Sequence, residues 1–194
     1  MKTVFTLLSA LIVLLSLSTS LKAQNKENDV NNISGFRKEF LDQLQEVQDK
    51  IIGLAEAIPA EKYSWRPMEG VRSVGEVFTH IAGGNYLFPS MVGHKTPKDY
   101  RADLDKISSD KEQIINALKK SFEFIDGSMS SVPNADLDKP ATMFGKQTTV
   151  RDVFFTAATH MHEHMGQMIA YTRMNKIVPP WTAAEQAKEQ KEKK

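Results

Sequence analysis

The sequence predicts an all-α protein, a four-helix bundle with long inter-helix connections. Apolar residues recur every three or four positions in four separate segments, which is the pattern of amphipathic helices. No segment shows a convincing strand pattern. Hydrophobic residues make up 41% of the 194 residues, enough for one core. Four helices with one apolar face each bury those faces best against one another.

The first predicted helix begins at Phe36 and ends before Pro59. Its apolar face consists of Phe36, Phe40, Leu44, Val47, Ile51, Leu54 and Ile58. The second helix begins after Ser73 and extends to about Val92. Ser73 and Glu76 have the spacing of a capping box, in which each side chain accepts a hydrogen bond from the other residue's amide.

Ser109 and Glu112 suggest a second capping box, which would open a third helix ending near Gly127. Its core face is Ile114, Leu118, Phe122 and Ile125. The fourth helix begins after Thr149, with Asp152 three residues on, and continues to about Asn175. We expect the intervening segments, 93–107 and 127–148, to be connections without regular structure.

The chain divides into four parts by composition. Residues 1–23 resemble a signal peptide: Lys2 precedes an apolar run that is shorter than the roughly 20 residues of a membrane span, and Ala23 is a small residue suited to cleavage. An uncleaved anchor is the alternative. Residues 24–33 are predicted to be a flexible lead-in, 34–182 the bundle, and 183–194 a charged flexible tail. We therefore expect an exported protein, periplasmic or secreted, with no stable membrane insertion after cleavage.

The charge balance argues against nucleic acid as a partner. The chain carries 25 Lys and Arg against 24 Asp and Glu, and loss of Lys2 and Lys22 would leave 23 against 24. A nearly neutral protein lacks the positive surface that phosphate binding needs. With no cysteine, disulfides and thiolate ligands are excluded, so a metal would have to be held by histidines and carboxylates.

Three histidines fall on the predicted core faces. His160 and His164 are four residues apart and so share one face of the fourth helix, with Val150, Val153, Ala157, Gln167 and Tyr171. His80 shares a face of the second helix with Val77, Gly84, Leu87 and Met91, and Gly83-Gly84 should leave open space beside it. Such buried rings need partners. One divalent metal ion bound by all three is the sharper interpretation, and hydrogen-bonded core histidines are the alternative.

The other two histidines should lie elsewhere. His162 lies roughly 200° around the helix from His160, and His94 lies roughly 21 Å along the second helix from His80.

Three further residues are candidates for catalysis. Glu76 shares the face of His80, although its capping role competes, and Gln167 and Tyr171 follow the histidines along the fourth helix. Tyr171 is explained equally well as a core aromatic. Three imidazoles with open coordination positions are typical of a catalytic metal, which favours hydrolysis or group transfer on an unknown small-molecule substrate.

Two blocks of the sequence resemble the DinB (DinB/YfiT-like) family. They are Trp65-Arg66-Pro67 with Ser73-Val74, Glu76 and Phe78-Thr79-His80-Ile81-Ala82, and His160 to His164 with Gly166-Gln167, Tyr171, Arg173-Met174-Asn175 and Val178-Pro179-Pro180-Trp181. The similarity covers roughly residues 36–182. Lys176 departs from it, standing where relatives often have glycine.

The resemblance implies an up-down-down-up bundle and a divalent metal, usually nickel or zinc, on three histidines matched by His80, His160 and His164. It implies no role in DNA repair. Some relatives resemble thiol-dependent transferases, but the lack of cysteine and the predicted export weaken that interpretation here. A non-catalytic bundle that binds metal or a partner is the alternative, and a homodimer is compatible with either.

Overall fold

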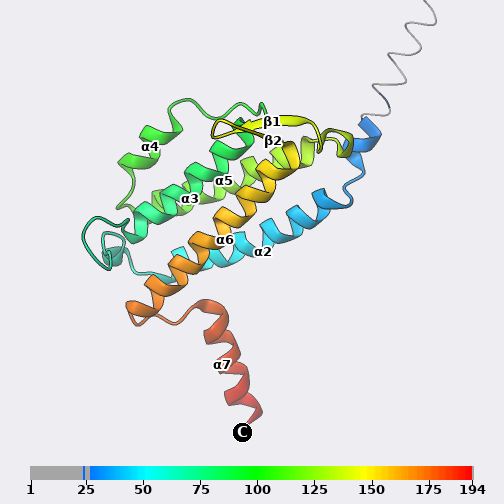
Figure 1. Ribbon diagram of the computed structural model, residues 1–194. Coiled ribbons are helices and arrows are strands. Elements are labelled where there is room, and N and C mark those ends of the chain that lie inside the picture. The colour runs from blue at the N-terminus through cyan, green and yellow to red at the C-terminus, as the bar shows by residue number, and fades with distance from the viewer. Residues whose placement is uncertain (1–23, 25–26, 194) are drawn as a thin grey trace, which may run out of the picture.

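Four long helices form the body of the protein in the computed structural model, which describes residues 24 and 27–193 (Figure 1). They are α2 (Phe36–Ala57), α3 (Val74–Ser90), α5 (Lys111–Ser131) and α6 (Val150–Met174). Two 3-10 turns, Ala60–Lys62 and Asn134–Asp136, follow α2 and α5. The four predicted helices are thus confirmed. The predicted signal segment lies outside the described residues.

The helices run up-down-down-up, as the family resemblance implies. α2 is antiparallel to α5, and α3 is antiparallel to α6, so the chain crosses the bundle between α3 and α5 without reversing direction. The contacts that fix these directions are Arg37 with Ser130, Lys111 with Ile58, Arg72 with Tyr171, and His80 with His160. α2 and α6 are parallel neighbours, and Phe40 packs edge-on against Phe154.

The predicted core faces of α2 and α5 are buried almost throughout. Leu44, Ile51 and Phe122 are at most 2% exposed, and only Phe36, at the start of α2, is partly exposed. α5 passes through Gly127 and continues to Ser131, beyond the predicted end. One helical glycine costs about 1 kcal/mol, less than burying the side chain of Met129 contributes one turn later.

Side chains cap three of these helices. Ser73 and Glu76 form the predicted capping box at the start of α3. Thr149 accepts a hydrogen bond from the Asp152 amide at the start of α6. The predicted box at Ser109 is wrong by one residue, because Asp110 is the N-cap of α5 and accepts from the Gln113 amide at 3.0 Å.

Both long connections contain regular structure, contrary to the prediction. A short helix, α4 (Tyr100–Lys106), lies in the first. Two antiparallel strands, β1 (Pro140–Met143) and β2 (Lys146–Thr149), lie in the second. Their two-residue turn, Phe144-Gly145, has φ angles of 50° and 79°, the type I′ turn that suits the twist of a hairpin.

The two ends of the described chain also differ from expectation. Residues 27–31 are helical, and the buried guanidinium of Arg37 donates to the carbonyls of Asp29, Val30 and Ser130 at 2.6–2.8 Å. The predicted flexible lead-in is therefore attached to the bundle.

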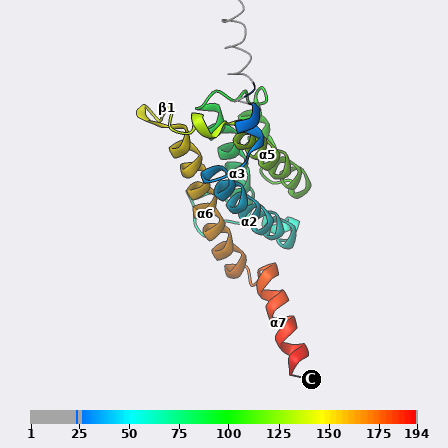
Figure 2. The ribbon, with the colours of Figure 1, turned by 90° about the vertical axis from the view of Figure 1, so that its right-hand side faces the viewer.

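The predicted charged tail is the helix α7 (Pro180–Glu192), which has no buried residue and projects from the bundle (Figure 2). None of the described helices is long and apolar enough to span a membrane.

Candidate metal centre

The structure brings the three predicted histidines together. His80 projects from α3 toward His160 and His164 on α6, and one ring nitrogen from each lies within 4.8 Å of the others. The Nε2 atoms of His80 and His160 are 3.1 Å apart. Eighty residues of sequence separate these two side chains, so the antiparallel packing of α3 on α6 creates the cluster.

The spacing of the nitrogens fits one shared divalent ion. Imidazole nitrogens bind zinc at about 2.0–2.1 Å, and a tetrahedral angle between two such bonds separates the nitrogens by about 3.3 Å. The 3.1 Å between His80 and His160 is close to that value. A hydrogen bond between two neutral imidazoles would also explain this distance. Such a bond involves only two rings, so it would not explain why the third lies beside them. The donor set is three nitrogens with no carboxylate among them.

Burial keeps two of the rings neutral. It is the largest of the causes that lower the pKa of His80 from 6.5 to about 4, and the neighbouring Arg72 and His164 contribute the rest. Burial likewise lowers the pKa of His160 to about 4, assisted by the two neighbouring histidines and Arg72. Both rings therefore carry a free lone pair at neutral pH, which is the form that binds a metal.

A chain of hydrogen bonds orients His164. The carbonyl of Arg72 can only accept, so the Tyr171 hydroxyl donates to it and accepts from the Gln167 amide nitrogen at 3.1 Å. This leaves Oε1 of Gln167 to accept from Nδ1 of His164 at 2.8 Å. His164 must then be protonated at Nδ1, and its Nε2 has a lone pair available for a metal. Gln167 and Tyr171 are thus positioning residues for the cluster.

Gly83 and Gly84 line the open cleft beside the site, as the sequence predicts, and Gly84 also makes room for His160. A Cβ atom there would lie 2.6 Å from Cε1 and 2.9 Å from Nδ1 of His160, because that ring packs directly on the backbone of α3. Nδ1 of His160 is buried and forms no hydrogen bond with any described residue.

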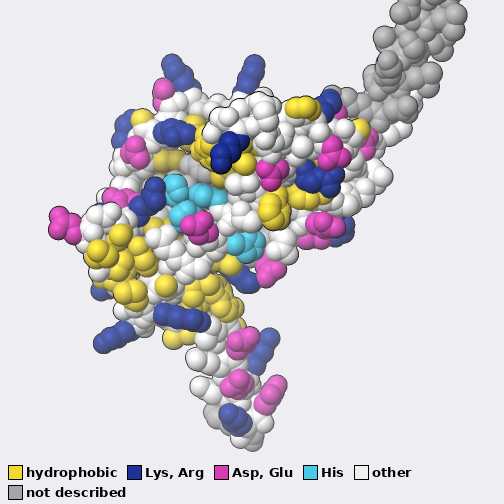
Figure 3. Space-filling model, in the orientation of Figure 1, with side chains coloured by type: hydrophobic (Ala, Val, Ile, Leu, Met, Phe, Trp, Pro, Cys, Tyr) yellow, Lys and Arg dark blue, Asp and Glu magenta, His cyan; other side chains and the backbone are white. Residues whose placement is uncertain are grey.

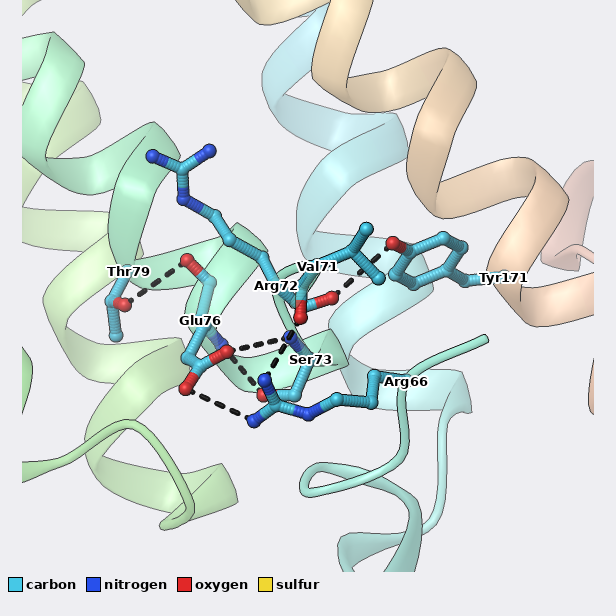
Figure 4. Close-up of polar contacts among 7 residues, drawn as sticks. All are labelled: Arg66, Val71, Arg72, Ser73, Glu76, Thr79 and Tyr171. Atoms are coloured by element: carbon cyan, nitrogen blue, oxygen red, sulfur yellow. Dashed lines mark hydrogen bonds and ion pairs between the residues drawn. The ribbon is translucent and has the colours of Figure 1, made fainter. Parts of the chain in front are cut away.

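The carboxylate of Glu76 belongs to the helix cap (Figure 4). It accepts from the Ser73 amide at 2.7 Å and from Arg66 at 3.2 Å. The Ser73 amide and then Arg66 lower the pKa of Glu76 despite partial burial, so the group stays ionised. Each of its two oxygens accepts one of these bonds, and the capping role is the one that the geometry supports.

The remaining histidines lie outside the cluster, as expected. Nδ1 of His162 bonds the carbonyl of Ala158, and His94 packs near Phe154.

The buried face of α6 is rotated from the predicted one. Met161 and Met168 are fully buried at its centre, whereas His160 and Gln167 are only partly buried at its edge. These two methionines therefore have a packing role.

Because His160 lies at the edge of the buried face of α6, the histidine cluster is open to a cleft. The cleft has a volume of about 710 Å³, and its walls come from α3, α4, α6 and the tip of the hairpin. Figure 3 shows histidine side chains at the surface on this face, beside basic and hydrophobic side chains. A depression of similar size, about 760 Å³, lies over the first turn of α5 and contains no histidine.

Sequence reasoning missed most of the cleft wall. Beyond His80 and His160, the wall includes Arg72, Leu87, Phe88, Tyr100, Arg101, Leu104 and Phe144. Three of these residues belong to α4, which was not predicted, and Phe144 belongs to the hairpin turn. Phe144, a large apolar residue directly before Gly145, is the one signal in the sequence that could have drawn attention to that turn.

The fold and the cluster define the chain as a four-helix-bundle protein with a three-histidine site able to hold a metal ion. The family model of the DinB superfamily matches residues 43–168, more than half of the chain. The chain therefore belongs to the DinB superfamily, which confirms the resemblance noted in its sequence.

Known proteins share this fold at low sequence identity. The chain is 25% identical to YjoA of Bacillus subtilis (strain 168) over 124 residues, which cover 62% of this chain and 78% of YjoA. A DinB-like protein of Bacillus cereus ATCC 10987 superposes with a TM-score of 0.67 at 19% identity, over 74% of this chain and 95% of that one.

YfiT of Bacillus subtilis, described as a probable metal-dependent hydrolase with an unusual four-helix bundle topology, superposes with a TM-score of 0.58 at 16% identity. The superposition covers 72% of this chain and 87% of YfiT. At these identities, the two structures establish the fold.

Proposed function

We propose that this protein is an exported metal-dependent hydrolase or group transferase. His80, His160 and His164 would hold its single divalent ion, nickel or zinc. The observation that supports this most is the convergence of three imidazoles on one point beside an open cleft. An ion held by three imidazoles keeps coordination positions free, can lower the pKa of water and can polarise a substrate oxygen.

The side chains around the cluster suit that role. Gln167 and Tyr171 fix the ring of His164, and Gly84 allows the ring of His160 to lie against α3. The cleft admits a small molecule to two of the three rings. YfiT, which is described as a probable metal-dependent hydrolase, has a similar fold, and this supports the proposed class of reaction.

Metal analysis of residues 24–194, produced without a histidine tag, tests the proposal. We expect about one nickel or zinc per chain by mass spectrometry, lost in His80→Ala, His160→Ala and His164→Ala. His162→Ala is the matched control, because this ring lies on the same helix and faces away from the cluster. It should keep the metal.

Activity is tested on the same proteins. Hydrolysis of chromogenic esters and amides should stop on chelation and return with the metal. Retention of metal in the three cluster variants would contradict the proposed centre. A stoichiometric metal without turnover on any substrate would favour the non-catalytic alternative.

A further inference from the structure

Arg72 is the basic residue nearest the cluster, and its guanidinium is available to a ligand. It lies just before α3 and lines the cleft together with His80 and His160. Arg66 pairs with Glu76, whereas the guanidinium of Arg72 points away from that pair and bonds no described residue (Figure 4).

The charges of the cleft favour an anion. Arg101 lines it beside Arg72, with its guanidinium over the ring of Tyr100. Two carboxylates also line it, but Glu76 is paired with Arg66, which leaves Asp105. Arginine binds carboxylates and phosphates through paired hydrogen bonds, so a ligand that carries one of these groups suits Arg72.

The hairpin tip supplies an apolar surface at a cost in backbone energy. Phe144 has a φ of 50°, a left-handed conformation that is unfavourable for a bulky residue, and its side chain is 66% exposed. Asparagine or glycine would suit the first position of this turn better. Neither the turn nor the core therefore requires phenylalanine.

The position of Phe144 in the cleft wall suits it to contact a ligand. It packs edge-on against Phe88, with ring centroids 6.2 Å apart, and Phe88 packs against His160 at 5.4 Å. Leu87 and Leu104 add further apolar side chains to the wall of the same cleft. A strained and exposed aromatic residue in the wall of a site is typical of a ligand contact.

We propose that the cleft binds small organic anions with an apolar body, the anionic group at Arg72 and the body against Phe144. This names the substrate class of the proposed function and rests on that function. A free inorganic anion would use only the arginine end of the cleft, and a neutral apolar molecule would use only the Phe144 end. The volume of about 710 Å³ lies within the range of small-molecule sites.

Three probes separate these contributions: phenylacetate, which has both features, acetate and 2-phenylethanol. Dissociation constants come from chemical-shift titrations of the full mature chain, both metal-loaded and metal-free. In the metal-free series the carboxylate cannot bind a metal, so the measured affinity reports its contact with Arg72. Phenylacetate should bind about tenfold or more tightly than either other probe in both series.

Two variants locate the contacts. Arg72→Gln should weaken phenylacetate about tenfold and leave 2-phenylethanol unchanged. Phe144→Asn should weaken phenylacetate several-fold and leave acetate unchanged. Asn-Gly is a preferred type I′ turn, so the Tm of Phe144→Asn should be equal to or above that of the wild type. Weaker binding by this variant then cannot reflect unfolding. The control is Arg173→Gln, which removes an equal charge from an exposed position outside the cleft.

Equal affinities for the three probes would overturn the proposal, and so would a loss in Arg173→Gln as large as that in Arg72→Gln. These outcomes are independent of the metal analysis. If the protein holds no metal but the metal-free series shows the expected pattern, the proposed function fails and the anion site stands. If the metal is bound and Arg72→Gln and Phe144→Asn change nothing, the centre stands and the substrate class is wrong.

Discussion

Gly84 on α3 makes room for the imidazole of His160 on α6, since a Cβ at this position would lie 2.6 Å from the ring. The backbone of α3 thus lies directly against one ring of the histidine cluster. A glycine in a helix costs about 0.5–1 kcal/mol relative to alanine, which here is a cost of the site.

Gly84→Ala should separate metal binding from stability. The new methyl group would displace the His160 ring, so we expect metal affinity to fall about tenfold or more, as when a group that positions a ligand is removed. Gly83→Ala is the control, because its Cβ would meet only Leu104 at 3.7 Å. That variant should keep its metal affinity and gain about 0.5–1 kcal/mol in unfolding free energy. Chelator competition and urea unfolding measure both quantities, and unchanged affinity in Gly84→Ala would contradict the argument.

Removal of the Gln167 side-chain oxygen should weaken metal binding, although Gln167 is not one of the three metal ligands. In Gln167→Leu, Nδ1 of His164 loses its acceptor, and metal affinity should fall about 10- to 100-fold. Gln167→Glu keeps an acceptor and should restore most of the affinity. Tyr171→Phe should have a smaller effect because it acts through Gln167. The order of the three dissociation constants checks the chain of hydrogen bonds, and equal values would refute it.

Acid should destabilise the metal-free protein between about pH 6.5 and pH 4. His80 and His160 have pKa values of about 4 in the folded protein against an ordinary 6.5. Between these values the unfolded chain binds more protons, so the unfolding free energy falls as the pH drops from about 6.5 toward 4. Urea midpoints at pH 7 and pH 5 measure this loss. It should be smaller in His160→Gln, and an equal loss would assign the effect to other groups.

Arg37 should be far more important for stability than its neighbour in sequence. Its guanidinium is fully buried and bonds carbonyls from residues 29 and 30 and from Ser130 at the end of α5. We expect Arg37→Ala to lower the unfolding free energy by about 2–4 kcal/mol. Lys38→Ala, which removes only an exposed pair with Asp42, should change it by about 0.5 kcal/mol or less. Similar losses in the two variants would show that the lead-in is not held by Arg37.

The sequence predicts the four long helices well because their signals are local. Prolines, capping residues and apolar positions at threes and fours mark α2, α3 and α6 closely, and the same spacing selected His80, His160 and His164. α5 departs at both ends for local reasons. At its start, Ser109 and Asp110 are both good N-cap residues, so the sequence does not decide between them. At its end, the helix continues through Gly127 because burial of neighbouring side chains offsets the cost of the glycine.

The walls of the cleft could not be predicted in this way. α4 has seven residues and buries only Leu104, and each strand of the hairpin has four residues, so neither shows a periodic pattern. The relation between Gly84 and His160 depends on how two helices cross. The central position of Met161 and Met168 has the same origin, because the crossing selects which side of α6 faces inward.

α4 and the hairpin lie outside the four-helix core, in connections of the kind that vary more among homologous proteins than the helices that they join. The four long helices must keep their packing to hold three ring nitrogens within 4.8 Å. Six of the residues that line the cleft come from these two connections, and the others come from α3 and α6 or lie just before α3. Insertions and substitutions in those connections can redirect the protein to a new substrate while the histidine cluster is inherited intact.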